Sequence, residues 1–227
     1  MTSNDLSPLY QNVDKLKGIG PKKASYLKNL GIKIVLDAFY ILPTRVIDRT
    51  QDIDFKTLEK GQVITTLVKI KKHRPPFNPR LPYVIECTKG SLIVNIIYFS
   101  MKGNFLRTKY PENKEFIISG KISFYKSNLS IAHPDYIEEV ENEQNLRRLE
   151  NIYPLTRGIS LKDIKKIING GKDYINNFDE WLNERLISKH QFYSFEDSLK
   201  KIHFPDNLQE VDKKEVFRKR PSYNNFS

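Results

Sequence analysis

The chain has 227 residues, of which 39% are hydrophobic and 11% aromatic, so it can bury one large core or two to three small ones and is not expected to be disordered. Its single cysteine, Cys87, excludes an internal disulfide framework and a zinc site of several thiolates, and it favours a reducing cytoplasm. The N-terminus lacks a signal-peptide pattern and the longest apolar run, LIVNIIYF, is far shorter than the roughly 20 residues that span a membrane, so we expect a cytoplasmic protein with no membrane partner.

The net charge of +11 is concentrated in the middle of the chain. Residues 61–126 hold 12 Lys and Arg against 3 Asp and Glu. Such a segment favours a polyanionic partner, because each phosphate that a basic side chain neutralises releases condensed counterions. The alternative is a lysine-rich surface that serves only solubility, so charge alone leaves both interpretations open.

The stretch LKGIGPKKASYLKNLGI near the N-terminus predicts two short helices joined by a tight turn. Gly18 and Gly20 can adopt the positive φ that such a turn often needs, and Pro21 suits the first position of the second helix. The pattern resembles the helix-hairpin-helix motif of DNA-binding proteins. Lys22 and Lys23 would lie at the positive end of the second helix, beside free backbone N–H groups, and are candidate phosphate contacts. A purely architectural hairpin is the alternative.

The pattern between Gln62 and Glu139 is that of β-strands rich in β-branched residues. A stretch compatible with a helix, residues 103–110, separates the third strand from the fourth. Strand–strand–strand–helix–strand–strand is the order of the OB-fold, a small Greek-key barrel whose face and loops bind single-stranded nucleic acid. The five predicted strands span residues 62–73, 82–88, 91–99, 115–125 and 128–137.

The loop after the first predicted strand carries a first group of candidate DNA contacts. OB-folds bind single strands with a basic groove and with aromatic rings on which bases stack. The loop HRPPFNPRLP supplies Arg74, Phe77 and Arg80 on a backbone that four prolines stiffen, which lowers the ordering entropy lost on binding. We therefore predict that these three residues contact DNA.

The end of the third predicted strand carries a second group, in which Tyr98, Phe99 and Phe105 are aromatic and Lys102 is basic. Because neighbouring residues of a strand face opposite sides, Tyr98 and Phe99 cannot both lie in the barrel core. At least one of the two rings is therefore expected to be exposed. The alternative is that the outward ring packs on a neighbouring domain.

Two polar clusters receive structural rather than catalytic interpretations. Asp48 and Arg49 are expected to pair or to cap at the junction between the helical start and the barrel. The sequence His133-Pro134-Asp135 is typical of a turn at a strand end, where a lone histidine is more often hydrogen-bonded than catalytic.

After Glu150 the pattern is helical. Ser160 with Asp163, and Ser194 with Asp197, predict helix starts that resemble capping boxes. Two apolar stripes are expected to be core rather than ligand sites: Leu161, Ile164, Ile167 and Ile168 form the first, and Trp181, Leu182, Arg185 and Leu186 form the second.

The order of short motifs resembles the N-terminal part of RecG, the family of bacterial ATP-dependent branch-migration helicases that remodel stalled forks and Holliday junctions. The resemblance runs from residue 10 to about residue 215 and rests on LKGIGPKKASYLKNLGI, AFYILPTRVIDRT, KHRPPF, the YF that ends the third strand, AHPDY and IYPLTRGIS. It implies an OB-fold wedge that splits the strands at the branch point and stacks aromatic rings on the separated bases. Phe99 then matches the stacking residue, with Tyr98 beside it. Phe105 matches less closely, because SMKGN is longer here than usual.

The resulting expectation is an α+β protein with an N-terminal helical hairpin, a five-stranded OB-fold barrel and a C-terminal helical segment. Its predicted parts are a helical region over residues 1–52, an OB-fold wedge domain over 53–140, a helical linker towards the family's motor over 141–212, and a divergent basic tail over 213–227.

We find no sequence motif for catalysis, nucleotide binding or metal binding. The sequence contains no Gly-x-x-x-x-Gly-Lys-Ser/Thr phosphate loop, and its four histidines and one cysteine are scattered. We therefore expect no cofactor, no metal and no catalysis by this chain alone, with branched or single-stranded DNA as partner. Two alternatives stay open: a protein-interaction fragment that docks through residues 145–210 and supplies the wedge in trans to a separate helicase motor, or the non-functional product of a frameshifted gene.

Overall fold

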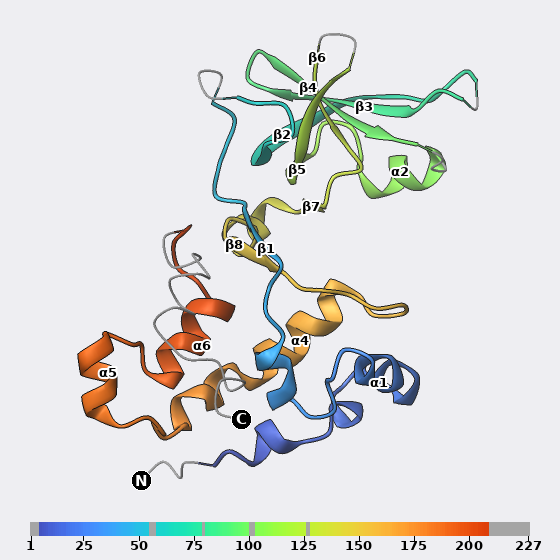
Figure 1. Cartoon of the computed structure of the whole chain (residues 1–227). Coiled ribbons are helices and arrows are strands. Elements are labelled where there is room, and N and C mark those ends of the chain that lie inside the picture. Colours follow the sequence, from blue (N-terminus) through green and yellow to red (C-terminus); the bar gives the residue numbers. More distant parts are fainter. Residues whose placement is uncertain (1–4, 55–57, 79, 100–102, 126–127, 209–227) are drawn as a thin grey trace. The chain divides into compact units, whose positions relative to one another are not determined.

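The computed structural model describes residues 5–54, 58–78, 80–99, 103–125 and 128–208 (Figure 1). The chain divides into two compact units. The helical unit lies within Met1–Val46 and Asn151–Ser227, and the barrel unit is Ile47–Glu150. The helical unit therefore consists of two segments of the chain, and the barrel unit lies between them in the sequence. Lys102 and the tail over 213–227 lie outside the described residues.

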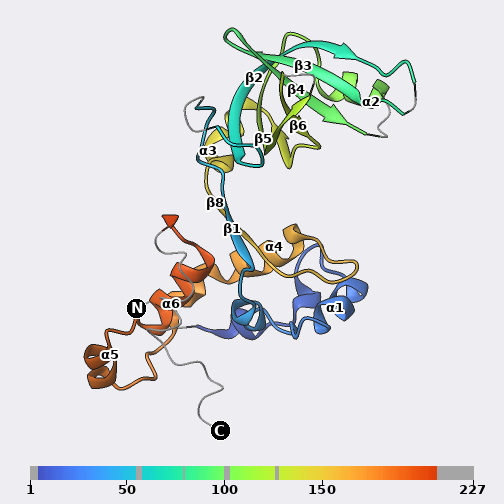
Figure 2. The ribbon, with the colours of Figure 1, turned by 45° about the horizontal axis from the view of Figure 1, so that its top comes forward.

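Five strands of the barrel unit form a closed barrel. They are β2 (Val63–Arg74), β3 (Tyr83–Lys89), β4 (Leu92–Tyr98), β5 (Glu115–Tyr125) and β6 (Asn128–Ala132), and helix α2 (Gly103–Lys109) connects β4 to β5. The strands follow one another in the order β2-β3-β4-β6-β5, and β5 pairs with β2 to close the ring (Figures 1 and 2). β4 and β6 are parallel, whereas the other neighbours are antiparallel. This order confirms the α+β architecture with a five-stranded OB-fold barrel.

The strand predicted over residues 128–137 is in fact two strands, which corrects the sequence analysis. β6 ends at Ala132, and β7 (Tyr136–Glu138) then pairs with β5. Between them His133 adopts a φ of +45°, a left-handed backbone conformation that breaks the extended chain. The predicted turn is confirmed, and it divides the strand.

The barrel core is made by the inward-facing side chains of these strands. Fully buried members include Ile64, Ile70, Ile85, Ile96, Ile118 and Ile131. At Gly120 the backbone of β5 passes so close to Ile131 that a Cβ would lie 2.6 Å from its Cγ2. Any larger residue at this position would have to displace the core, so the tight curvature of the barrel depends on this glycine.

The helical unit is built from short helices around a second hydrophobic core. Its 3-10 helices are η1 (Ser7–Tyr10), η2 (Val13–Lys15), η3 (Leu36–Tyr40) and η5 (Lys172–Asn177), and its α-helices are α1 (Pro21–Lys28), α4 (Leu161–Gly171), α5 (Glu184–His190) and α6 (Phe195–His203). Leu27 on α1, Phe39 on η3 and Ile167 on α4 are all buried in this core. The two ends of the chain therefore share one core, although the whole barrel unit separates them in the sequence.

The N-terminal hairpin has a three-residue first arm, η2, and an eight-residue second arm, α1. Gly18 has a φ of +82°, so the predicted left-handed turn is present. Gly20 has a φ of −80° and a ψ of 176°, which any residue can adopt. The expectation of a positive φ at this position was therefore wrong. Pro21 occupies the first turn of α1, as predicted.

The C-terminal helices begin as predicted but bury only one of the two apolar stripes. Ser160 and Asp163 form a complete capping box on α4, and Ser194 caps α6 by accepting from the N–H of Asp197. The first stripe is core: Ile164, Ile167 and Ile168 are each at most 2% exposed, and Leu161 is partly buried against the same core. The second is not: Trp181 precedes α5, Leu186 lies on it, and both are about half exposed. The expectation of a core stripe there was wrong, because α5 begins only at Glu184.

Two short strands contain the points at which the chain passes from one unit to the other. β1 (Arg45–Asp48) and β8 (Leu149–Ile152) pair as a separate two-stranded sheet. The short helices η4 (Val140–Asn142) and α3 (Glu143–Leu146) precede β8. Of all the helices in the described parts of the chain, none is long and apolar enough to cross a membrane.

Candidate nucleic-acid interface

The two aromatic residues at the end of β4 have opposite environments. Tyr98 pairs with Tyr83 across the sheet and is 8% exposed, packed in the barrel core. Phe99, the next residue, is 51% exposed. The prediction that at least one ring is exposed is confirmed. Because its ring is enclosed by the core, Tyr98 supports the barrel wall in this structure and offers no free face for stacking.

The exposed ring of Phe99 rests on His133. The imidazole is stacked against the phenyl ring with centroids 5.7 Å apart and an interplanar angle of 30°. The backbone N–H of Phe99 donates to Nε2 of His133 over 3.1 Å, and the N–H of His133 donates to the carbonyl of Ile97 over 2.9 Å. The parallel pairing of β4 with β6 brings these residues together, although they are 34 positions apart. Phe99 is therefore an exposed ring on a rigid support.

A buried arginine holds the turn that carries His133. Arg49 is 3% exposed and donates to Glu150 over 2.6 Å, to the Oγ of Ser119 over 2.9 Å and to Asp135 over 3.0 Å. Its guanidinium also lies 4.8 Å from the ring centroid of Tyr136. Since Asp135 belongs to the His-Pro-Asp turn, Arg49 connects the junction with β1 to the support of Phe99.

The structural interpretation of both junction residues is confirmed. Asp48 caps the following bend by accepting from the N–H of Thr50 over 2.8 Å and from its hydroxyl over 2.6 Å. Asp48 and Arg49 therefore act through other partners rather than by pairing with each other. Burial of Tyr136, reinforced by its hydrogen bond to Glu150, raises the pKa of its phenol to about 12, so that the O–H remains a donor to the carboxylate.

Replacing His133 with asparagine is expected to weaken any binding that depends on the Phe99 ring. Asparagine tolerates the left-handed backbone at this position, so the turn should survive while the aromatic support is lost. An aromatic pair contributes about 0.5–1.5 kcal/mol, which corresponds to a loss of roughly 2- to 12-fold in affinity for a branched DNA. Fluorescence anisotropy measures this loss. In the His133→Asn background, Phe99→Ala should cost less than it does in the native chain; equal costs in both would show that the support is irrelevant.

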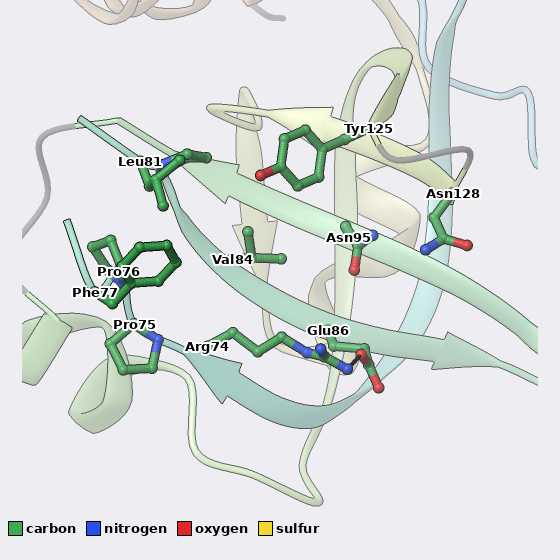
Figure 3. A pocket seen from close by; sticks show the side chains of 11 residues that line it. Arg74, Pro75, Pro76, Phe77, Leu81, Val84, Glu86, Asn95, Tyr125 and Asn128 are labelled. Carbon is green, nitrogen blue, oxygen red and sulfur yellow. Dashed lines mark hydrogen bonds and ion pairs between the residues drawn. The ribbon is translucent and has the colours of Figure 1, made fainter. Parts of the chain in front are cut away.

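A groove of about 330 Å³ opens on the outer wall of the barrel (Figure 3). Its floor is formed by β3 and β4, and residues from the β2–β3 loop, the end of β5 and the start of β6 complete its lining. Its lining residues are Arg74, Pro75, Pro76, Phe77, Leu81, Pro82, Val84, Glu86, Asn95, Tyr125 and Asn128. This is the face of an OB-fold at which oligonucleotides bind in other members of the fold.

The first group of predicted contacts is only partly gathered at this groove. Phe77 is 93% exposed at its edge, and Arg74 lines it. Arg74 forms an ion pair with Glu86, a nearly buried carboxylate that Lys71 also approaches at 3.4 Å. Burial opposes ionisation of Glu86, but the two cations outweigh it and hold its pKa below the ordinary value. Arg80 is exposed in the same loop and is not among the residues that line the groove.

The remaining candidates are not among the residues that line the groove. Phe105 is 55% exposed on α2, with the ammonium of Lys109 5.8 Å from its ring centroid. Lys22 and Lys23 belong to the helical unit, where Lys22 is exposed. Lys23 donates to Asp163 over 2.6 Å, so its charge is already compensated. Across the residues that the structure describes, no group of three or more His, Cys, Asp and Glu side chains is placed to hold a metal ion.

Four polar or aromatic groove residues were missed by the sequence analysis: Glu86, Asn95, Tyr125 and Asn128. A signal for the first two was present. Glu86 and Asn95 are the polar members of the otherwise apolar runs YVIEC and LIVNIIY, and the two residues pair directly across β3 and β4. Nothing local indicated Tyr125 or Asn128, because only the pairing of β6 with β4 in the closed barrel brings these two strand ends to the groove.

Known proteins with similar sequences and folds show which family this chain resembles. The family model of the RecG wedge domain matches residues 12–175. The ATP-dependent DNA helicase RecG of Aquifex aeolicus is 24% identical over 208 residues, which cover 88% of this chain and 26% of that protein. The protein of the same name from Staphylococcus aureus (strain MSSA476) is 28% identical over 218 residues, which cover 92% of this chain and 30% of that protein.

Among solved structures, one of RecG bound to a three-way DNA junction matches with a TM-score of 0.73 and 25% sequence identity. The match covers 96% of this chain and 30% of that chain. The chain thus spans between 26% and 30% of the length of these relatives.

Proposed function

The chain belongs to the RecG wedge domain family, and from that premise we propose that it binds branched DNA and keeps the strands apart at the branch point. In this proposal it is the DNA-contacting module of a branch-migration activity at forks and Holliday junctions, in DNA repair and recombination. It makes and breaks no covalent bond itself. ATP hydrolysis and the pulling of duplex arms belong to a helicase motor, in the same polypeptide or in a partner.

The observation that carries the proposal is the exposed ring of Phe99 on its support. An aromatic ring held by a stacked histidine and by two backbone hydrogen bonds loses little freedom when a base stacks on it. Base–aromatic stacking contributes about 1–3 kcal/mol per base and accepts every base, as a branch-point wedge requires. The relative whose structure was solved on a three-way DNA junction supports a branched substrate.

The mechanism that follows is mechanical. Basic residues of the barrel unit attract the phosphate backbone without regard to sequence. The barrel stands at the branch point in this proposal, so the strands of arms drawn past it pass on separate sides, and Phe99 replaces the stacking partner that the last base pair loses. The energy of unpairing is supplied by the motor, and Phe99 lowers the part of it that is due to unstacking.

Replacing Phe99 with alanine is expected to abolish the preference for a branched substrate. Loss of one stacked base corresponds to a decrease of roughly 5- to 150-fold in affinity for a labelled three-way fork. Affinity for duplex should change by less than about twofold, because phosphate contacts dominate there. The measurement is fluorescence anisotropy on fork, single strand and duplex across a salt series.

Phe124→Ala is the matched control. Phe124 is 55% exposed on β5, which is close to the exposure of Phe99. It pairs with Leu129 near the start of β6, whereas Phe99 contacts His133, just after the end of β6. Its removal should leave fork binding unchanged. The proposal fails if the native chain binds fork, single strand and duplex equally with one steep salt dependence, or if the two alanine variants behave alike.

A further inference from the structure

We infer that the helical unit binds the phosphate backbone of duplex DNA, without regard to sequence, through one basic face. The basic face consists of Lys17, Lys22, Arg157, Lys162 and Lys166. The inference rests on the proposed function and adds a second contact to it: the barrel unit meets the separated strands, whereas the basic face meets a duplex arm.

Two segments far apart in the sequence supply the basic face. Residues 15–33 hold six lysines and no acidic residue, and residues 152–171 hold four basic residues and one acidic residue, Asp163. In the fold, α1 from the first segment and α4 from the second lie side by side (Figures 1 and 2). Neither segment belongs to the basic stretch over residues 61–126, so this concentration of charge arises only when the helical unit folds.

Three contacts bring the two segments together. The ammonium of Lys166 on α4 donates to the backbone carbonyl of Lys17, in the turn before α1. Lys23 of α1 pairs with Asp163 of α4 over 2.6 Å. At Gly158, in the loop that precedes α4, a Cβ would lie 2.5 Å from an aromatic ring of α1. The turn, α1, the loop and α4 therefore adjoin one another.

Helix geometry places the cations where these elements meet, because residues four positions apart share one side of a helix. Lys162 lies on the same side of α4 as Lys166, which contacts the turn. Lys22 lies on the same side of α1 as Tyr26, and Tyr26 contacts the loop that carries Arg157.

The charge of the basic face is available to a ligand. Four of its cations are exposed and form no ion pair with any residue that the structure describes: Lys17, Lys22, Arg157 and Lys162. Asp163 does not compensate them, because its side chain is 10% exposed and its carboxylate accepts hydrogen bonds from Lys23 and Ser160. Such a face attracts a polyanion.

The composition of the face favours duplex over single-stranded DNA. Single-strand sites combine basic residues with exposed aromatic rings on which bases stack. The aromatic residues of the two segments are Tyr26, which packs against Gly158, and Tyr153, which is 3% exposed. A face with charge and without a stacking ring binds phosphates, and a duplex presents twice as many phosphates per unit length as one of its strands.

The sharpest test removes two exposed lysines of the face, in the double variant Lys22→Gln, Lys162→Gln. Affinity for a labelled duplex of about 20 base pairs should fall about 10-fold or more at about 50 mM salt. The slope of log affinity against log salt should become shallower by about 2, one for each lost phosphate contact. Two duplexes of unrelated sequence should respond alike, and affinity for (dT)12 should change by less than about twofold.

The matched control is Arg185→Gln, Lys189→Gln, which removes the same charge from exposed positions of α5 in the same unit. It should leave duplex affinity within about twofold of the native value. Equal losses in the two double variants would show a general effect of net charge and overturn the inference. An unchanged duplex affinity in Lys22→Gln, Lys162→Gln would overturn it too, as would equal losses for duplex and (dT)12.

A chemical footprint locates the contact without any substitution. Duplex should reduce the acetylation of Lys17, Lys22 and Lys162 in the native chain, measured by mass spectrometry, and leave that of Lys189 unchanged. Protection confined to other lysines would contradict the inference. The melting temperatures of both double variants should match the native value, because all the replaced side chains are exposed.

The outcomes keep the basic face apart from the proposed function. Phe99→Ala should lower the ratio of fork to duplex affinity, whereas Lys22→Gln, Lys162→Gln should lower both affinities together. A chain that prefers forks but loses no duplex affinity in the double variant would reject the basic face and leave the wedge standing. A chain without fork preference that shows this loss would reject the wedge and leave the basic face standing.

Discussion

Replacing Arg49 with methionine is expected to lower the free energy of unfolding of the barrel unit by about 3–5 kcal/mol. The guanidinium compensates Glu150, which is 3% exposed, and methionine would leave that carboxylate charged and buried. Removing one member of a buried ion pair costs more than the pair contributes, because the remaining carboxylate stays away from water and loses its Arg49 cation, while it keeps the hydrogen bond from Tyr136. The effect is measurable by hydrogen exchange of barrel peptides as a function of urea.

Two further variants separate a buried charge from a general loss of packing. In the double variant Arg49→Met, Glu150→Gln the buried negative charge is removed together with the cation, so the loss should be smaller than that of Arg49→Met alone. Lys114→Met breaks the ion pair with Glu139, which is about half exposed on both sides, and should cost less than about 1 kcal/mol. A loss at Arg49 no larger than the loss at Lys114 would contradict the assignment.

Arg49→Met should also weaken DNA binding at the proposed interface. Arg49 holds Asp135, and Asp135 belongs to the turn that presents His133 to the ring of Phe99. We therefore expect Arg49→Met to reduce the preference for a fork even under conditions in which the barrel remains folded. A variant that stays folded and keeps the native preference would show that the turn holds its shape without Asp135.

Lowering the pH from 7 to 5 is expected to lower the free energy of unfolding of the helical unit by about 2 kcal/mol through His203. His203 is 5% exposed; burial lowers the pKa of its imidazole from 6.5 to about 4, and the hydrogen bond to the carbonyl of Phe39 only partly offsets this. Both ring nitrogens of the neutral imidazole form hydrogen bonds. Nε2–H donates to the carbonyl of Phe39 over 2.8 Å, and Nδ1 accepts from the phenol of Tyr153 over 2.9 Å. A second proton on Nδ1 would displace the hydrogen bond that this nitrogen accepts from Tyr153.

The sign follows from proton uptake on unfolding. Between pH 6.5 and 4 the unfolded chain binds a proton at His203 that the folded chain does not, so the contribution is complete above pH 6.5 and is lost as the pH falls towards 4. Asp163 of the same unit does not interfere. Burial opposes its ionisation, but the hydrogen bonds from Lys23 and Ser160 outweigh burial and lower its pKa below 3.8.

Urea denaturation at pH 7 and pH 5 measures the effect, with the fluorescence of Trp181, the single tryptophan, as the reporter. His203→Gln removes the titrating group and should remove most of the difference between the two pH values, whatever its stability at pH 7. The same pH dependence in this variant as in the native chain would assign the effect to other groups.

Much of the fold could be predicted because its signals are local. β-Branched alternation indicated the strands of the barrel, and serine with aspartate three residues later indicated the starts of α4 and α6. Where the local signal was ambiguous the prediction failed: the stripe at Trp181 and Leu186 has helical spacing, but only part of it lies in a helix and none of that helix is buried. Helical spacing by itself does not determine what an element packs against.

The candidate site was less predictable, since its parts come from distant segments. The sequence by itself established the barrel, the aromatic pair at the end of β4 and the requirement that one of the two rings face outward. The family resemblance already indicated Phe99 as the stacking residue. Only the tertiary structure showed that its ring is the exposed one, that His133 supports it, and that Arg49 holds the turn that carries His133. It also brought Asn95 to one groove with residues of the β2–β3 loop and of the adjoining ends of β5 and β6. The physical reason is the sequence separation over which each interaction acts. Alternation and capping involve residues a few positions apart, whereas the side chains that meet at the site are brought together by strand pairings between segments far apart in the chain.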